Sequence, residues 1–196
     1  MEIARQFPFD KLLKRYGMKL KKFALSAAAA LPLVFASQVS ATSLKKLDFD
    51  DMVAQANACV VAEAQSATTE FRNGQVTTLT TFRVTKSAFG NVGQTITVAT
   101  DGGERTMGRL QVAEVNAGAP RFFTNQESLL FLSEANAQGA FNILGYNQGR
   151  FAVRENANGV DMVSLPVGDG GQITLDNALS VISDARSNPN SSDIRR

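Results

Sequence analysis

The stretch from Asn73 to Lys86, NGQVTTLTTFRVTK, decides the fold class of this chain. Asn73-Gly74 is a strong two-residue hairpin signal, because both turn positions favour a positive φ. The strand that follows alternates, and one of its faces carries Val76, Thr78, Thr80, Phe82 and Val84. Because a strand over Ala58–Ala67, which starts with an apolar run, is expected before the turn, we expect the two strands to pair across it.

Short apolar segments separated by Gly or Asn turns continue this pattern. They predict further strands over residues 95–100, within 104–120, and over 129–132, 141–146, 150–154 and 160–165. The run Leu129–Leu132 indicates a central strand that is buried on both faces. Because strands and helices do not alternate along the chain, a small antiparallel barrel or sandwich is expected rather than a parallel α/β sheet.

Helical spacing occurs at both ends of this β region. Apolar residues repeat at Phe49, Met52, Val53 and Ala56, and again at Leu175, Leu179, Ile182 and Ala185. Either Asp48 or Asp50 is a suitable cap for the first helix. The acidic cluster of Asp48, Asp50 and Asp51 suits the helix dipole, with a cation site as the alternative. The polar tail 188–196 is expected to be disordered.

The N-terminal region predicts export. Residues 18–41 have the layout of a signal peptide, with Lys19, Lys21 and Lys22 before the 14-residue apolar run Phe23–Ala36. Small residues at Val39-Ser40-Ala41 predict cleavage after Ala41. Residues 1–17 fit no signal layout, which favours Met18 as the initiator; a longer n-region is the alternative. The product is expected to be periplasmic or secreted, as one β-barrel domain over residues 42–187.

The charge balance depends on this processing. The whole chain has 20 Lys plus Arg and 18 Asp plus Glu, whereas removal of residues 1–41 leaves 13 basic and 16 acidic residues, a net charge of −3. A basic nucleic-acid footprint is therefore not expected. No second apolar stretch approaches the length of a membrane span, so none is expected after signal removal. The sequence leaves the oligomeric state open.

Composition excludes several chemistries. The chain has no His and one Cys, which excludes His-based triads, His metal ligands, Cys-rich zinc sites and an intramolecular disulfide. Carboxylate chemistry, Lys-activated hydroxyls, oxygen-ligand metal sites and plain binding remain; no cofactor or metal is expected. Cys59 lies in an apolar run, which favours a buried core thiol over a reactive thiol or an intermolecular bridge.

Two groups of residues are candidate contacts. Asp101, Glu104, Arg105 and Arg109 surround the diglycine Gly102-Gly103, and this loop either binds a ligand or is a solvated turn. Phe89, Phe122 and Phe123 lie at predicted loop ends, where they are either core residues or a protein-contact patch. The dispersed carboxylates Glu63, Glu70, Glu114, Glu127 and Glu134 allow a glycosidase-like pair only if two of them face each other.

The segment from Phe49 to Val153 resembles a family of uncharacterised bacterial exported proteins. The resemblance rests on turn and strand motifs: Ala56–Val61, Phe82–Val84, Thr97–Gly103, Ala119–Phe122, Leu129–Leu132 and Gly145–Phe151. More distantly, the first half is similar to the netrin-like fold of tissue inhibitors of metalloproteinases. That similarity implies an OB-type barrel. It does not carry over the inhibitory mechanism, which uses an N-terminal Cys held by disulfides.

We therefore expect an exported, mainly β domain: a small OB-like, netrin-like antiparallel barrel with one N-terminal and one C-terminal helix. It is expected to act by binding another exported protein. Modulation of an exported protease is one such role. A small-ligand carrier is the alternative, followed by a carboxylate-dependent hydrolase.

Overall fold

A computed structural model describes residues 44–72, 74–167 and 170–189. The expected upstream extension, the signal peptide with its cleavage site at Ala41, and residues 190–196 of the tail lie outside the described residues. Among the residues described, neither α-helix has the length and apolar character that a membrane crossing requires.

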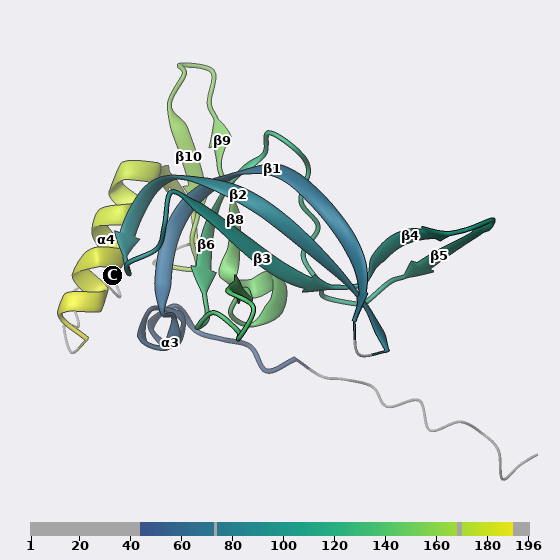
Figure 1. Cartoon of the computed structure of the whole chain (residues 1–196). Helices are drawn as coiled ribbons and strands as arrows, with labels where there is room; N and C mark the ends of the chain where they lie inside the picture. Colours follow the sequence, from purple (N-terminus) through teal and green to yellow (C-terminus); the bar gives the residue numbers. More distant parts are fainter. Residues whose placement is uncertain (1–43, 73, 168–169, 190–196) are drawn as a thin grey trace, which may run out of the picture. The chain divides into compact units, whose positions relative to one another are not determined.

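The chain is mainly β, with one α-helix before the strands and one after them (Figure 1). In chain order, the elements are α3 (Phe49–Gln55), β1 (Ala58–Arg72), β2 (Gln75–Phe89), β3 (Thr95–Asp101), β4 (Gly103–Met107), β5 (Leu110–Glu114), β6 (Glu127–Leu132), β7 (Ala140–Phe141), the 3-10 helix η2 (Tyr146–Gly149), β8 (Arg150–Ala152), β9 (Arg154–Glu155), β10 (Asp161–Ser164), β11 (Gln172–Thr174) and α4 (Leu175–Ser187).

The long hairpin of β1 and β2 confirms the main sequence prediction. The two strands pair in antiparallel register from Cys59 opposite Phe89 to Arg72 opposite Gln75, which leaves a two-residue turn. Gly74 takes a φ of +85°, as this turn requires. Of the β2 residues expected to share one face, Val76, Thr80 and Phe82 are buried, and Thr78 and Val84 are half-buried.

Six strands form one sheet in the order β7-β3-β2-β1-β6-β8, in which only the β3–β7 pair is parallel. The expected closed barrel is not confirmed, because no ladder of this sheet joins its two ends in the described part of the chain. A single bridge links Leu132 of β6 to Ile143, just after β7, and the amide of Ser133 donates to the carbonyl of Asn142 at 2.9 Å.

The predicted strand over residues 141–146 is wrong beyond its start. Only Ala140–Phe141 form a ladder, and Gly145 and Tyr146 both take left-handed conformations, with φ values of 62° and 60°. These conformations end extended structure and begin the 3-10 helix η2. This early turn keeps β7 short, and it is one reason why the sheet has no closing ladder.

The central strands β1 and β6 separate two apolar cores. Cys59, Val61, Leu129 and Phe131 face α3, α4 and β10, and we call this the helix-side core. On the other face, Ala58, Val60, Ala62, Leu130 and Leu132 pack with Phe82, Ile96 and Val98, and we call this the strand-side core. The prediction that residues 129–132 form a strand buried on both faces is therefore confirmed.

Both predicted helices are confirmed, and they pack into the helix-side core. Helix α4 buries Leu175, Ala178, Ile182 and Ala185, and the hydroxyl of Thr174 caps its first turn by accepting from the amide of Asn177. Helix α3 has Asp48 at its N-cap position without a side-chain capping bond. Arg186 of α4 joins the helices, because its guanidinium donates to the carbonyls of Val53 and Ala54 at 2.8 and 2.9 Å.

Cys59 is a fully buried core residue, as the sequence predicts. Burial raises the pKa of its thiol, because the apolar surroundings do not solvate a thiolate. The neutral thiol acts as a small apolar side chain between β1 and the helices.

Gly90, which follows β2, offers a test of this packing. A Cβ at this position would lie 2.5 Å from the Cβ of Ala58, and the residue has a φ of +91°. Gly139 has a φ of +78° with no heavy atom within 4 Å of such a Cβ. We expect Gly90→Ala to lower the free energy of unfolding by about 2 kcal/mol more than Gly139→Ala, because only the first adds a clash to the strained φ. Equal losses in urea unfolding would contradict this packing.

Candidate functional site

The inner face of the β1–β2–β3 sheet changes from apolar to hydroxyl-bearing at one end. Beyond the strand-side core, the alternating side chains of the strands place Thr69, Thr78, Thr80 and Thr100 along a groove with a volume of about 250 Å³. We call this the threonine groove. The segment 101–104 and the segment 119–123 form parts of its walls, together with residues 114–116 at the end of β5.

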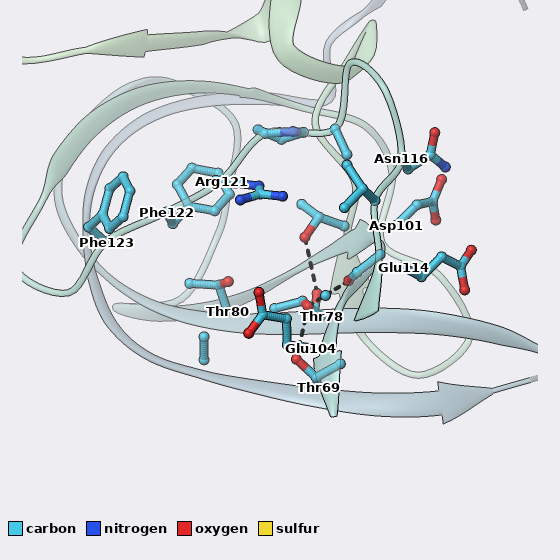
Figure 2. Close-up of a pocket in the computed structure, with 17 residues that line it drawn as sticks. Thr69, Thr78, Thr80, Asp101, Glu104, Glu114, Asn116, Arg121, Phe122 and Phe123 are labelled. Atoms are coloured by element: carbon cyan, nitrogen blue, oxygen red, sulfur yellow. Dashed lines mark hydrogen bonds between the residues drawn. The ribbon is translucent and has the colours of Figure 1, made fainter. Parts of the chain in front are cut away.

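Hydrogen bonds hold most of this hydroxyl surface in place (Figure 2). The hydroxyl of Thr78 donates to the carbonyl of Gly102 at 2.7 Å, and it lies 3.1 Å from the hydroxyl of Thr69. The hydroxyl of Thr100 donates to the carbonyl of Thr78 at 3.4 Å. Three of the four threonines are therefore joined in one hydrogen-bonded group centred on Thr78, which reaches the carbonyl of Gly102 just before β4.

Thr80 differs from the other three. Its side chain is only 2% exposed, and among the described residues its hydroxyl has no hydrogen-bond partner. The residue lines the groove, and Figure 2 shows its hydroxyl directed toward the middle of the groove. Among the described residues, the fully buried side-chain polar atoms without a partner do not include this hydroxyl, so it keeps contact with solvent in the groove. A ligand group that enters the groove would replace water as its partner.

The charged residues of the groove come from both walls. Asp101 and Glu104 are exposed at the rim, whereas Glu114 accepts a hydrogen bond from the amide of Val76 at 3.1 Å. Arg121 lies on the other wall, and in the described part of the chain it forms no ion pair with any of these carboxylates. Figure 2 shows Arg121 and Glu104 both directed toward the middle of the groove.

The aromatic wall of the groove depends on Phe122. Its ring packs edge-on against Phe82 with the centroids 4.8 Å apart, and the guanidinium of Arg150 lies 5.2 Å from its centroid. Arg150 also donates to the amide oxygen of Gln126 at 3.0 Å. Burial lowers the pKa of Arg150, which remains a cation at neutral pH. Phe122 is therefore a fixed, half-buried surface rather than a free side chain.

The structure divides the predicted ligand-binding residues into two groups. Asp101 and Glu104 line the threonine groove, whereas Arg105 and Arg109 are exposed on the β4–β5 hairpin and do not line it. Gly102 and Gly103 have φ values of +87° and +140°, and the buried Gly102 joins β3 directly to β4. The threonines and Arg121 were not among the predicted residues; the alternation of Thr in β2 was the available signal.

The three predicted contact phenylalanines do not form one patch. Phe89 is half-buried against the helix-side core, with the guanidinium of Arg186 at 4.8 Å from its ring centroid. Phe122 is half-buried in the groove wall, as described above. Phe123 is 69% exposed at the rim of the groove, which leaves it as the most accessible of the three.

The β4–β5 hairpin extends from the sheet beside the groove (Figure 1). Its two strands pair only with each other in the described ranges. The hairpin and the residue after it expose three apolar side chains, Leu110, Val112 and Val115, with Leu110 at 70% and Val115 at 75%. Unpaired backbone edges next to exposed apolar side chains are features of strand-addition sites.

A second hollow of about 320 Å³ adjoins the groove and shares Thr100, Asp101, Ala119 and Pro120 with it. It adds Asn142 and Tyr146 to the surface, and the left-handed backbone of Tyr146 holds this partly exposed side chain there. The second hollow therefore adds one aromatic and one amide side chain to the surface beside the groove.

Residues 44–72, 74–167 and 170–189 contain no group of three or more His, Cys, Asp or Glu side chains arranged to hold a metal ion. Comparisons with protein-family models, curated proteins and solved structures give no match to this chain.

The two neighbouring threonines Thr78 and Thr80 give a matched test of the groove. We expect Thr78→Val to lower the free energy of unfolding by about 1 kcal/mol, because it removes an internal hydrogen bond. Thr80→Val is expected to leave that free energy unchanged or raise it, because no internal bond is lost. Urea unfolding of both variants measures the difference. A loss at Thr80 as large as that at Thr78 would mean that its hydroxyl has an internal partner.

Proposed function

We propose that this chain is an exported, non-enzymatic binding module that holds a segment of another exported protein at the threonine groove and the β4–β5 hairpin. One observation carries the proposal: a polar groove, into which the buried residue Thr80 directs a hydroxyl without a protein partner, lies beside a hairpin with free backbone edges and exposed apolar side chains. Export itself rests on the sequence of residues 18–41.

The proposal includes an OB-like, netrin-like architecture. In an OB-fold, five strands form a partly open Greek-key barrel. The support here is the order β3-β2-β1-β6, the parallel β3–β7 pair, and the Leu132–Ile143 bridge from β6 to the residues after β7. Two helices against one outer face also agree with the netrin-like resemblance. The inhibitory mechanism of that family forms no part of the proposal.

Strand addition is the binding mode that the hairpin favours. A two-stranded hairpin is marginally stable alone in water, and a third strand supplies backbone hydrogen bonds that its edges lack. The exposed Leu110 and Val112 and the groove-rim residue Phe123 provide apolar contacts of the kind found at protein interfaces. An extended segment paired with the hairpin would lie next to the threonine groove, which allows its side chains to enter.

Photo-crosslinking in intact cells tests this function with the full chain. Benzoylphenylalanine is placed at Phe123 and at Leu110, with the exposed helix position Ser180 as a matched control. We expect light-dependent adducts of one discrete protein mass from Phe123 and Leu110 and none from Ser180, because only the first two lie at the proposed interface.

Equal adducts at all three positions, or none at Phe123 and Leu110, would contradict the proposal. Native mass spectrometry of the same protein distinguishes the alternative. A retained mass of a few hundred daltons without a protein adduct would favour a small-ligand carrier over a protein-binding module.

A further inference from the structure

The threonine groove is asymmetric in charge. Asp101 and Glu104 stand exposed at its rim, and neither forms an ion pair within the described segments. Glu114 adds a third carboxylate, which is partly occupied by the amide of Val76. Arg121 is the one cationic side chain among the residues that line the groove. A group of positive charge in the groove would therefore have a net electrostatic attraction to its walls.

The floor of the groove adds a second requirement, which is independent of the rim charges. Thr80 is nine-tenths or more buried, and its hydroxyl faces the groove without an internal partner. Both lone pairs of this oxygen are available to a donor that reaches the floor. A ligand that displaced water from the floor without a donor of its own would leave the hydroxyl unsatisfied, so a ligand that fills the groove needs a polar head at the end of a slender stem.

Part of the groove lining is apolar. The ring of Phe122, held by Phe82 and Arg150, lines the groove together with Pro120 and Ala67. A hydrocarbon stem along this surface loses little favourable solvation, whereas a charged stem loses much of it. A lysine side chain has this construction, because four methylene groups carry an ammonium with three donors. Its compact head suits acceptors in different directions, such as Thr80 and Glu104, better than a planar guanidinium does.

We propose that the threonine groove takes a lysine side chain of the bound protein segment. The ammonium donates to the hydroxyl of Thr80 and the carboxylate of Glu104, and Asp101 adds attraction from the rim. The stem packs against Phe122. This inference rests on the proposed function, since it names the side chain that the bound segment places in the groove.

The test uses NMR with the full-length, isotopically labelled chain and minimal probes. Nα-acetyl-lysine methylamide is titrated, and the norleucine and glutamate methylamides of the same form are controls for the stem and the charge. We expect the lysine probe to shift amide signals near Thr80 and Glu104, with at least about tenfold weaker binding of the norleucine probe, since hydrogen bonds to a charged group are lost. The glutamate probe is expected not to bind.

Variants assign the contacts. Glu104→Gln and Thr80→Val are each expected to weaken the lysine probe by about three- to tenfold, because each removes one hydrogen bond to the ammonium. Glu134→Gln removes an exposed carboxylate that does not line the groove and is expected to have no effect. Urea unfolding of each variant confirms that the fold is retained, and Thr80→Ser, which keeps the hydroxyl, is expected to bind like the unchanged chain.

Equal binding of the lysine and norleucine probes, an absence of shifts near the groove, or equal effects of Glu104→Gln and Glu134→Gln would overturn the inference. Butylammonium is the further probe: if it binds as tightly as the lysine methylamide with the same shifts, the groove recognises a free amine, which overturns the assignment to a protein segment. If no amino-acid probe binds but protein crosslinks form at Phe123 and Leu110, only the lysine assignment is contradicted. If no probe binds and no crosslinks form, the proposed function is contradicted as well.

Discussion

The burial of β1 and β6 on both faces is the constraint on which the rest of the structure depends. Consecutive residues of both strands are fully buried, so each strand contributes side chains to two cores at once. Each buried Val, Leu or Phe contributes about 1.5–3 kcal/mol relative to exposure, so this pair of strands contributes strongly to the stability of both cores. A slip of one residue in their register would exchange the two cores, so the register is strongly specified.

This constraint explains the position of the candidate site. β1 and β2 continue beyond the part of the sheet that both cores cover, and there the inner face changes from Phe82 and Val98 to threonines. The hydroxyl of Thr78 binds the carbonyl of Gly102, and those of Thr69 and Thr100 bind Thr78 in turn, whereas the hydroxyl of Thr80 faces the groove. A rigid sheet thus positions both the groove and the β4–β5 hairpin beside it.

The sequence predicts the elements well where local and tertiary preferences agree. Asn73-Gly74, the run Leu129–Leu132 and the spacing of α4 each specify a local structure that the cores then reinforce. The prediction is wrong after Phe141, because residues with extended propensity are followed by left-handed Gly145 and Tyr146. In the site, Asp101 and Glu104 were predicted from their proximity to the diglycine turn. Arg121 and Thr80 were not, because only tertiary structure brings them to the same groove.

Native-state hydrogen exchange tests the central claim most directly. The claim is that β1 and β6, which are buried on both faces, form the stable centre of the fold, and that the β4–β5 hairpin beside it has much lower local stability. The account predicts that amides of residues 58–62 and 129–132 exchange only through global unfolding, and that paired amides of β4 and β5 exchange at least about a hundredfold faster. Exchange of the β1 and β6 amides at the rate of the hairpin amides would contradict it.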